Sequence, residues 1–526
     1  MTRSLARPCL VAIAALTVFL PLPLRAERAI GTNLAVLRPG SSEWAFVDLF
    51  HQASTWIPQV CEPVGPWDTG EVLQLTPDGW PILQPGQAAG AVIAAVDGRY
   101  PGGQYLCLYE GSGTIEFHLD ATVIDSQPGQ MVVEVQPENL IHVKITASDP
   151  SNPIRNIRLI MPGFWENYTA QLFHPVFLER LAPYSTIRFM DWQRTNTTPV
   201  TSWSDRATPD QPTQTTEAGV ALEYMIELAN RTGKSPWFCI PHLADDDYVE
   251  QFATLVRDQL DPAIPAYIEY SNECWNSAFP QAAYCQQRGL ALGLSEDPFH
   301  AQILFYSQRA VEIFTTFENV FGGTDRLVRV LGAQLATPWV GQQVSAHQNA
   351  YLKADAVAVN PYMGISIGTS FAPLTEGWQV DNVLAVLQDE LPSLGEKVAE
   401  YAGIASTTGL ELIAYEGGQH LVGVGALQSN VELANLFHEA NRAEGMYDVY
   451  RDLLDTWSAN GGGLFMHYHA TELPNLFGSW GALEYQDQCL DEAPKYRALI
   501  DYAGSNFVRG DCNQDGRQDL SDQVYL

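Results

Sequence analysis

Basic residues are scarce in this sequence of 526 residues. It holds 28 lysines and arginines against 61 aspartates and glutamates, which gives a formal net charge of −33 at pH 7. A charge of this sign repels phosphate backbones and anionic bilayers, and salt screens that repulsion only beyond a Debye length of about 8 to 10 Å. We therefore expect neither nucleic acid nor a membrane surface as a partner.

Long apolar runs are absent after the first residues of the chain. The run CLVAIAALTVFLPLPL follows Arg3 and Arg7 and ends before Arg25 and Ala26. Two prolines break it, and it is shorter than the ~20 residues that a membrane span needs. The pattern favours a secretory signal peptide over residues 1–26, cleaved near Ala26, rather than the alternative of a membrane anchor. We expect a secreted or extracytoplasmic protein.

Cysteine is sparse, and its spacing excludes the common zinc sites. No CxxC pair or Cys/His cluster with zinc spacing occurs in the sequence. Export permits disulfides, and a bridge from Cys274 to Cys285 or from Cys61 to Cys107 would close a loop of reasonable size, although the sequence leaves the pairing open. Internal repeats and low-complexity segments are also missing, so with 46% hydrophobic residues the chain is globular, with one large core or two.

Short apolar strands alternate with helical patterns along most of the chain. We predict seven strands at residues 185–192, 235–242, 266–273, 326–334, 354–362, 410–418 and 462–469. An eighth lies upstream at 29–36, followed by a helical pattern at 42–56. Apolar residues at helical spacing over 220–232 end at Gly233, a typical helix C-cap. Repeated strand and helix units predict an α/β fold, a (β/α)8 TIM barrel with a parallel sheet.

One long segment interrupts the barrel pattern. Between the first two predicted strands, TIEFHLD, MVVEV and IHVKITAS alternate with period two between glycines and prolines. This pattern predicts a small antiparallel β module inserted at residues 62–163, within a barrel formed by 27–61 and 164–503. The alternative is an elaborated barrel loop that only covers one end. Residues 504–526 would form a linker and a short tail.

Two of the predicted strands end in glutamate. Glu273 ends the strand in YSNE, and Glu416 ends the strand in LIAYEGG. The active sites of such barrels lie at the carboxyl ends of the strands, and an unpaired carboxylate held away from water costs several kcal/mol unless it has a partner or a task. Two carboxylates facing each other cleave glycosidic bonds as acid and nucleophile, or as acid and base. A lone Asn-Glu pair, by contrast, often only caps a helix.

The residues around these two glutamates resemble those of the clan A glycoside hydrolases, which are retaining (β/α)8 enzymes. In that clan the acid/base follows an asparagine at the end of the fourth strand, and the nucleophile ends the seventh. The resemblance covers residues 29–503 without the inserted module, and it implies Glu273 as acid/base after Asn272 and Glu416 as nucleophile. Cys274 stands where the clan usually has proline, so the resemblance implies no particular subfamily or sugar.

The same resemblance implies further substrate-contacting positions. It suggests an arginine that supports the nucleophile, a sugar-binding histidine after the third strand, a tyrosine that contacts the nucleophile, and aromatic residues that line the sugar subsites. In this sequence these are Arg188, His242, Tyr362, Trp275, Trp480 and His467. Tyr362 and Trp275 also suit packed core positions. Glu269, on the same strand face as Glu273, is expected to lie deeper in the barrel with a partner.

The last residues of the chain contain a calcium-loop pattern. Its possible ligands stand at positions one, three, five, seven and twelve, namely Asp511, Asn513, Asp515, Arg517 through its carbonyl, and Asp522. Gly516 would supply the sharp turn. The segment resembles one repeat of a dockerin, which implies bound Ca²⁺ and a cohesin-like partner. The alternative is an acidic, solvated tail.

The sequence therefore predicts an exported retaining glycoside hydrolase that cleaves a poly- or oligosaccharide and needs no cofactor for catalysis. One alternative is a non-catalytic glycan-binding or surface-assembly protein on the same barrel. Another is a metal-dependent hydrolase that uses His467 and His469, which are two residues apart on one predicted strand.

Overall fold

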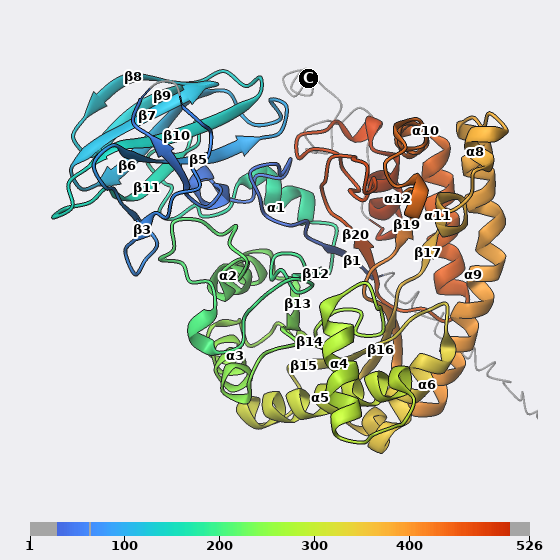
Figure 1. Ribbon diagram of the computed structural model, residues 1–526. Helices are drawn as coiled ribbons and strands as arrows, with labels where there is room; N and C mark the ends of the chain where they lie inside the picture. Colours follow the sequence, from blue (N-terminus) through green and yellow to red (C-terminus); the bar gives the residue numbers. More distant parts are fainter. Residues whose placement is uncertain (1–28, 63–64, 505–526) are drawn as a thin grey trace, which may run out of the picture.

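The computed structural model describes residues 29–62 and 65–504. The predicted signal peptide and the calcium-loop residues Asp511, Asn513, Asp515, Arg517 and Asp522 lie outside these ranges. Figure 1 shows an antiparallel β unit from the early part of the chain beside a larger body of strands and helices. No helix in the described ranges is both long and apolar enough to cross a membrane.

Eight parallel strands close into a barrel in the order β1-β12-β13-β14-β15-β16-β18-β20. Each strand lies inside one of the predicted segments, so the predicted (β/α)8 fold is confirmed. Glu273 follows the fourth strand and Glu416 follows the seventh. The strands are β1 (Ile30–Asn33), β12 (Thr186–Arg188), β13 (Ser235–Ile240), β14 (Ala266–Tyr270), β15 (Leu327–Gly332), β16 (Ala356–Val359), β18 (Glu411–Ala414) and β20 (Phe465–Tyr468).

Alternate residues of the barrel strands face two different cores. Trp237 and Cys239 of β13 belong to a small cluster that fills the barrel interior, whereas Phe238 and Ile240 of the same strand pack with the surrounding helices. This division follows from the period of two along a strand. The core between the strands and the surrounding helices includes Trp457, which is fully buried.

Helices surround the barrel on its outer side (Figure 1). The helix predicted to end at Gly233 is present as α2, and Gly233 has a left-handed backbone with φ of 66°. Five other helices in the described ranges begin with proline, whose fixed φ suits a first helical turn. The helices are α1 (Pro175–Leu181), α2 (Leu222–Thr232), α3 (Asp246–Gln259), α4 (Pro280–Ala291), α5 (Pro298–Phe321), α6 (Pro338–Ala346), α7 (Ile365–Gly368), α8 (Ala372–Thr375), α9 (Val380–Thr408), α10 (Val431–Arg442), α11 (Gly445–Ala459) and α12 (Pro494–Tyr502).

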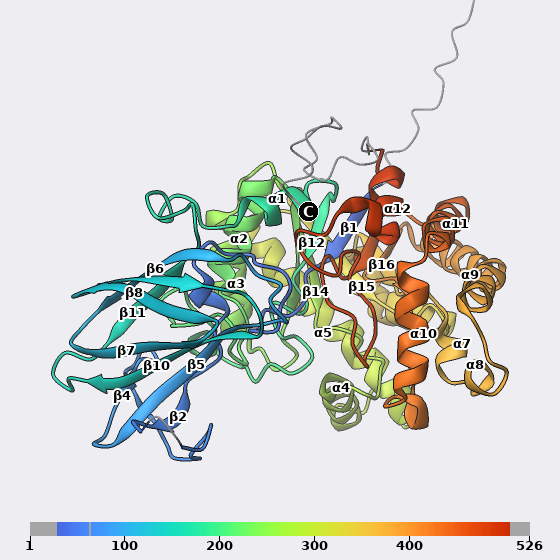
Figure 2. The same ribbon diagram turned by 90° about the horizontal axis from the view of Figure 1, so that it is seen from above.

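The inserted segment, together with residues 57–60 before it, folds into two four-stranded antiparallel sheets, seen beside the barrel in Figure 2. Met131, Val133 and Val135 alternate inward along one strand and pack in a core of their own. One sheet holds β2 (Ile57–Val60), β5 (Gln87–Ala95), β10 (Leu140–Ser148) and β7 (Gly113–Leu119), and the other β11 (Arg155–Ile160), β6 (Gly103–Glu110), β9 (Gln130–Val135) and β8 (Ala121–Gln127). Two short pairs of strands complete the list, β3 (Gln74–Leu75) with β4 (Pro81–Ile82), and β17 (Tyr362–Met363) with β19 (Gly418–Gln419).

The helix predicted at 42–56 is wrong. Only Leu49–Gln52 forms a short 3-10 turn, η1. Residues 42–50 are all buried, which a helix with one apolar stripe does not explain. Trp44 packs in the core of the β module while Phe46 packs in the barrel core. The segment is therefore an extended connection that buries side chains in two cores.

The disulfides suggested by the sequence are also wrong, because Cys61, Cys107, Cys274 and Cys285 all carry free thiols. The Cys61 thiol donates to two backbone carbonyl oxygens at 3.1 and 3.2 Å. Cys107 instead faces the core of the β module. Cys274 and Cys285 are both buried and interact through a thiol hydrogen bond.

We expect Leu159→Ala to destabilise the β module by about 2 to 5 kcal/mol, because the removed methyl groups leave a cavity in a closed core. Leu159 is 0% exposed in that core. Denaturant unfolding followed by fluorescence measures the change. Ile124→Ala, at a residue 52% exposed on β8, is the matched control and should cost about 1 kcal/mol or less. Equal losses in the two variants would contradict the assignment of this core.

Candidate active site

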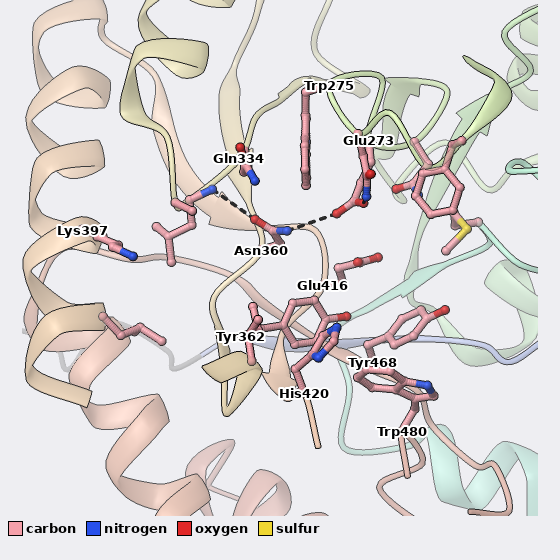
Figure 3. Close-up of a pocket in the computed structure, with 18 of the residues that line it drawn as sticks. Glu273, Trp275, Gln334, Asn360, Tyr362, Lys397, Glu416, His420, Tyr468 and Trp480 are labelled. Carbon is pink, nitrogen blue, oxygen red and sulfur yellow. Dashed lines mark hydrogen bonds between the residues drawn. The ribbon is translucent and has the colours of Figure 1, made fainter. Parts of the chain in front are cut away.

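A cavity of about 820 Å³ opens at the carboxyl ends of the barrel strands. Both glutamates singled out in the sequence reach into it, Glu273 from the segment after β14 and Glu416 from the segment after β18 (Figure 3). Asn272, Trp275, Tyr362 and Trp480, which the resemblance also implied, line the same cavity. Its volume suits an organic ligand rather than a single ion.

The backbone turns sharply where Glu273 enters the cavity. Ser271 has φ of 58° and Glu273 has φ of 41°, both in the left-handed region that disfavours residues with a Cβ. Such conformations cost about 1 to 3 kcal/mol each and persist where the surroundings hold them. Here the fixed side chain of Glu273 supplies part of that support.

Three side chains donate hydrogen bonds to the Glu273 carboxyl group. Tyr415 Oη donates to Oε1 at 2.8 Å, and Asn360 Nδ2 donates to the same oxygen at 3.1 Å. Asn276 Nδ2 donates to Oε2 at 2.8 Å. The donors come from three different segments, so the position of the carboxyl group is fixed before any ligand arrives.

Arg188 connects Glu416 to the barrel interior. Its side chain is 0% exposed, and Nη1 donates to Glu416 Oε2 at 3.4 Å. Nη2 donates to Glu269 Oε2 at 2.8 Å and to Asn272 Oδ1 at 2.9 Å. Asn33 Oδ1 accepts the other Nη1 hydrogen bond at 3.1 Å. Glu269 is thus the deep, paired carboxylate that the sequence predicts, and Trp237 Nε1 also donates to it at 2.9 Å.

Burial raises the pKa of both cavity glutamates. For Glu416, burial and then the Glu273 carboxylate raise the pKa to about 8, although Arg188 opposes them. For Glu273, burial raises the pKa while the hydrogen bonds from Asn276 and Tyr415 oppose the shift. Each negative charge disfavours the other, so the pair holds one shared proton near neutral pH. The cavity therefore offers both a proton donor and a carboxylate.

Aromatic rings form a wall beside Glu416. The ring centroid of Trp480 lies 5.9 Å from that of Tyr362, 5.2 Å from that of His420 and 5.6 Å from that of Tyr468. In Figure 3 Trp275 lies on the opposite side of the cavity from Trp480. The Tyr362 hydroxyl also hydrogen-bonds Glu416. The two glutamates thus lie between apolar, flat surfaces.

His242 and His467, which we expected to contact a sugar, do not line this cavity. His242 packs edge-on against Tyr284 of α4, with ring centroids 5.5 Å apart. His467 is 0% exposed, and its ring lies 3.2 Å from the Tyr450 hydroxyl and 3.0 Å from the carbonyl oxygen of His469. His242 thus packs against an aromatic ring, whereas His467 bridges Tyr450 and the backbone of His469.

The geometry does not support a metal centre at His467 and His469. His469 lies 2.7 Å from an Asp191 oxygen and 2.8 Å from a Glu472 oxygen. Burial opposes its charge, but these two partners raise the pKa of His469 to about 9. A protonated imidazole has no free lone pair for a metal. Over residues 29–62 and 65–504, no group of three or more His, Cys, Asp or Glu side chains is placed to hold a metal ion.

Sequence reasoning missed several residues of the site. Asn360 and Tyr468 stand at or next to the ends of barrel strands, so the rule used for Glu273 and Glu416 would have found them. Tyr415 directly precedes Glu416, but its hydroxyl reaches across to Glu273. His420 lies in the segment after β19, where no motif marks it.

Comparisons with known proteins give matches only among solved structures; no family model and no curated protein sequence matches the chain. One similar structure is a 4-O-α-L-rhamnosyl-β-D-glucuronidase from Fusarium oxysporum 12S, with 11% identity and a TM-score of 0.39 over 65% of this chain and 66% of that one. This chain therefore spans less than two thirds of that enzyme's length.

Two further similar structures have smaller chains. Fungal β-1,4-galactanases match with 12% identity and a TM-score of 0.37, over 62% of this chain and 91% of theirs. A family 1 β-glucosidase from Thermotoga maritima matches with 10% identity and a TM-score of 0.36, over 63% of this chain and 86% of that one. At these identities and scores, an activity has to be argued from the residues of this chain.

We expect Glu416→Gln to change how stability depends on pH. A carboxyl group with a pKa of about 8 in the folded chain and an ordinary value of 4.5 binds its proton more tightly when folded, so the wild type loses stability as pH rises through that window. Each tenfold difference in proton affinity is worth about 1.4 kcal/mol. The variant, which has no proton to lose, should gain up to a few kcal/mol over the wild type between pH 5 and pH 8.

Urea unfolding at both pH values measures this difference. Glu396→Gln, at an exposed position on α9, is the control and should follow the wild type. Parallel pH dependence of the wild type and Glu416→Gln would refute the raised pKa.

Proposed function

We propose that this protein is a retaining glycoside hydrolase that acts on a poly- or oligosaccharide. The observation that carries the proposal is the pair Glu273 and Glu416 at the ends of the fourth and seventh strands, lining one cavity, with a buried guanidinium against only one of them. This arrangement supplies an acid and a nucleophile with different electrostatic surroundings, as glycosidic bond cleavage by double displacement requires.

The walls of the cavity suit a pyranose ring. The CH faces of a sugar pack against aromatic planes, which Trp275, Tyr362 and Trp480 supply. The sugar hydroxyls need hydrogen-bond partners when they leave water, and the amides of Gln334 and Asn360 lie in the same wall. The aromatic and amide groups together would hold a sugar with its anomeric carbon near the glutamates.

In the first step Glu273 gives its proton to the glycosidic oxygen while a Glu416 oxygen attacks the anomeric carbon. The bond from that carbon to the leaving oxygen breaks, and a glycosyl ester of Glu416 forms. In the reactive state the shared proton stands on Glu273, and Arg188, at 3.4 Å, favours the negative charge on Glu416 against the burial that raises the pKa of that group. The Tyr362 hydroxyl helps to orient the attacking oxygen.

In the second step Glu273, now a carboxylate, takes a proton from water. The water oxygen attacks the anomeric carbon, the ester bond to Glu416 breaks, and the sugar leaves with its original configuration. Tyr415 and Asn360 hold Glu273 in place through both steps, because their hydrogen bonds reach Oε1 and leave the orientation of the group fixed.

We also propose that the protein is exported and that its tail binds calcium. The apolar run after Arg3 and Arg7 supports export, with cleavage near Ala26, and the loop pattern from Asp511 to Asp522 supports Ca²⁺ binding and a cohesin-like partner. Both segments lie outside the described residues, and the catalytic proposal does not depend on them.

We expect Glu273→Gln to lower hydrolysis of natural glycans by about 10² to 10⁴-fold, the usual contribution of a general acid. The loss should be smaller on aryl glycosides, whose leaving groups need no protonation. Glu416→Gln should abolish turnover on both kinds of substrate. Initial rates on a panel of glycans and aryl glycosides measure these effects.

Glu411→Gln is the matched control, since this residue lies at the opposite end of the strand that leads to Glu416. Its rates should equal those of the wild type. NMR of the first-formed anomer tests retention. Saturable glycan binding without hydrolysis by the wild type would instead support the non-catalytic alternative, and full activity in both active-site variants would refute the assignment of the glutamates.

A further inference from the structure

A second cavity, of about 610 Å³, lies where the β module meets the barrel. We call it the junction cavity and define it by Asp48, Asp78, Arg158, Tyr168, Gln211 and Tyr224. These residues come from the segment before β2, the β3–β4 hairpin, β11, the connection after β11, the loop between β12 and α2, and α2 itself. Both units of the protein thus contribute walls.

Several polar groups in this cavity lack partners within the described ranges. The Arg158 guanidinium is exposed to solvent and lies over the Tyr168 ring at 5.6 Å, and within those ranges it forms no side-chain hydrogen bond or ion pair. Asp48 is 8% exposed, and its Oδ1 atom accepts hydrogen bonds from two backbone N–H groups at 3.1 and 2.8 Å. Its Oδ2 atom accepts no hydrogen bond from the described residues. The Gln211 Oε1 atom is buried without any hydrogen-bond partner in the described structure.

Of these groups, Gln211 Oε1 is the buried one, and unpaired buried polar atoms are rare in folded proteins and call for an explanation. A ligand that supplies the missing partners is one, and the rigidity of the walls supports it. Gln214 N donates to the His51 carbonyl oxygen at 2.8 Å, and Thr215 Oγ1 donates to that of Ala53 at 2.7 Å. These bonds fix the loop between β12 and α2 against the segment before β2, so the junction cavity is preformed.

The charges of the junction cavity select the chemistry of its ligand. Asp48, Asp78 and Asp210 face one arginine, Arg158, so an anionic ligand would meet an excess of negative charge. A bound metal ion is not indicated, because no side-chain group suited to one is found in the described ranges. Hydroxyl groups both donate and accept hydrogen bonds, so a neutral polyol can satisfy the carboxylates and the guanidinium together.

We propose that the junction cavity binds a neutral segment of a glycan chain, as a second site separate from the catalytic cavity. Tyr168 and Tyr224 would contact sugar CH faces, Arg158 would donate to ring and hydroxyl oxygens, and the Asp48 carboxylate would accept from hydroxyl groups. The loop between β12 and α2 connects the two sites, since Asn196 lines the catalytic cavity and Gln211 lines the junction cavity. The same loop therefore contributes walls to both sites.

The choice of a polysaccharide as ligand rests on the proposed function, whereas the cavity and its unpaired groups do not. The test uses the full chain carrying Glu416→Gln, so that bound polymer is not consumed. Affinity electrophoresis and calorimetry measure its binding to neutral xylan, mannan, galactan and β-glucan, with polygalacturonate as the acidic comparison. Arg158→Ala combined with Tyr168→Ala should weaken binding of a neutral polymer about tenfold.

Arg155→Ala is the matched control, because Arg155 lies on the same strand but pairs with Glu110 outside the cavity. It should bind polymer like its parent. Asp210→Ala, at an exposed position of the opposite wall, should weaken binding without disturbing a core. Circular dichroism checks that each variant is folded.

Activity separates the two proposals. With Glu416 intact, the double variant should keep its rate on a short aryl glycoside while its KM for the polymer rises severalfold. Unchanged polymer affinity and KM in both the double variant and Asp210→Ala would overturn the junction site alone. Tighter binding of polygalacturonate than of every neutral polymer would overturn it as well. Absence of hydrolysis, with polymer binding that the double variant loses, would overturn the proposed function and support the junction site.

Discussion

The buried guanidinium of Arg188 is the group on which the rest of the site depends. A charge at 0% exposure costs several kcal/mol unless it is paired and hydrogen-bonded. Arg188 on β12 finds its partners on or just after three other strands, at Asn33, Glu269, Asn272 and Glu416. The requirement to compensate one cation therefore holds together strand ends that are far apart in the sequence, and it fixes Glu416 relative to Asn272, the neighbour of Glu273.

The same cation explains why the cavity keeps a proton. Arg188 lies 2.8 Å from Glu269 and 3.4 Å from Glu416, and its shortest contact is with the deeper carboxylate. One positive charge cannot compensate Glu269, Glu416 and Glu273 together where the three carboxyl groups are largely removed from water. The least costly state has one of the two cavity carboxyl groups protonated, which is also the state that the proposed acid catalysis requires. The charged groups inside the barrel thus influence the protonation of the carboxyl groups in the cavity.

The sequence was most informative where a local pattern and the fold agree. Strand periodicity predicted all eight barrel strands. The placement of active sites at the carboxyl ends of such strands then predicted the positions of Glu273 and Glu416. The helix predicted at 42–56 is absent because the apolar residues of this segment pack into two cores. Their spacing in the sequence resembles that of a helix with one apolar face. His242 and His467 do not line the cavity, because a position on or just after a strand does not fix whether the side chain points into it. Tyr415 was missed because its contact with Glu273 spans 142 residues of sequence.

The β module enters and leaves the barrel at nearly one point. Asp48, before the module, pairs with Ile160 at its last strand, and Asp48 Oδ1 accepts from the Leu159 amide at 2.8 Å. Once folded, the module therefore behaves as a short connection between β1 and α1, however many residues it contains. The entropy of closing a loop depends on the flexible length between its ends, so the barrel bears little of that cost. An insertion anchored in this way can be enlarged, exchanged or lost while the order of the barrel strands stays the same.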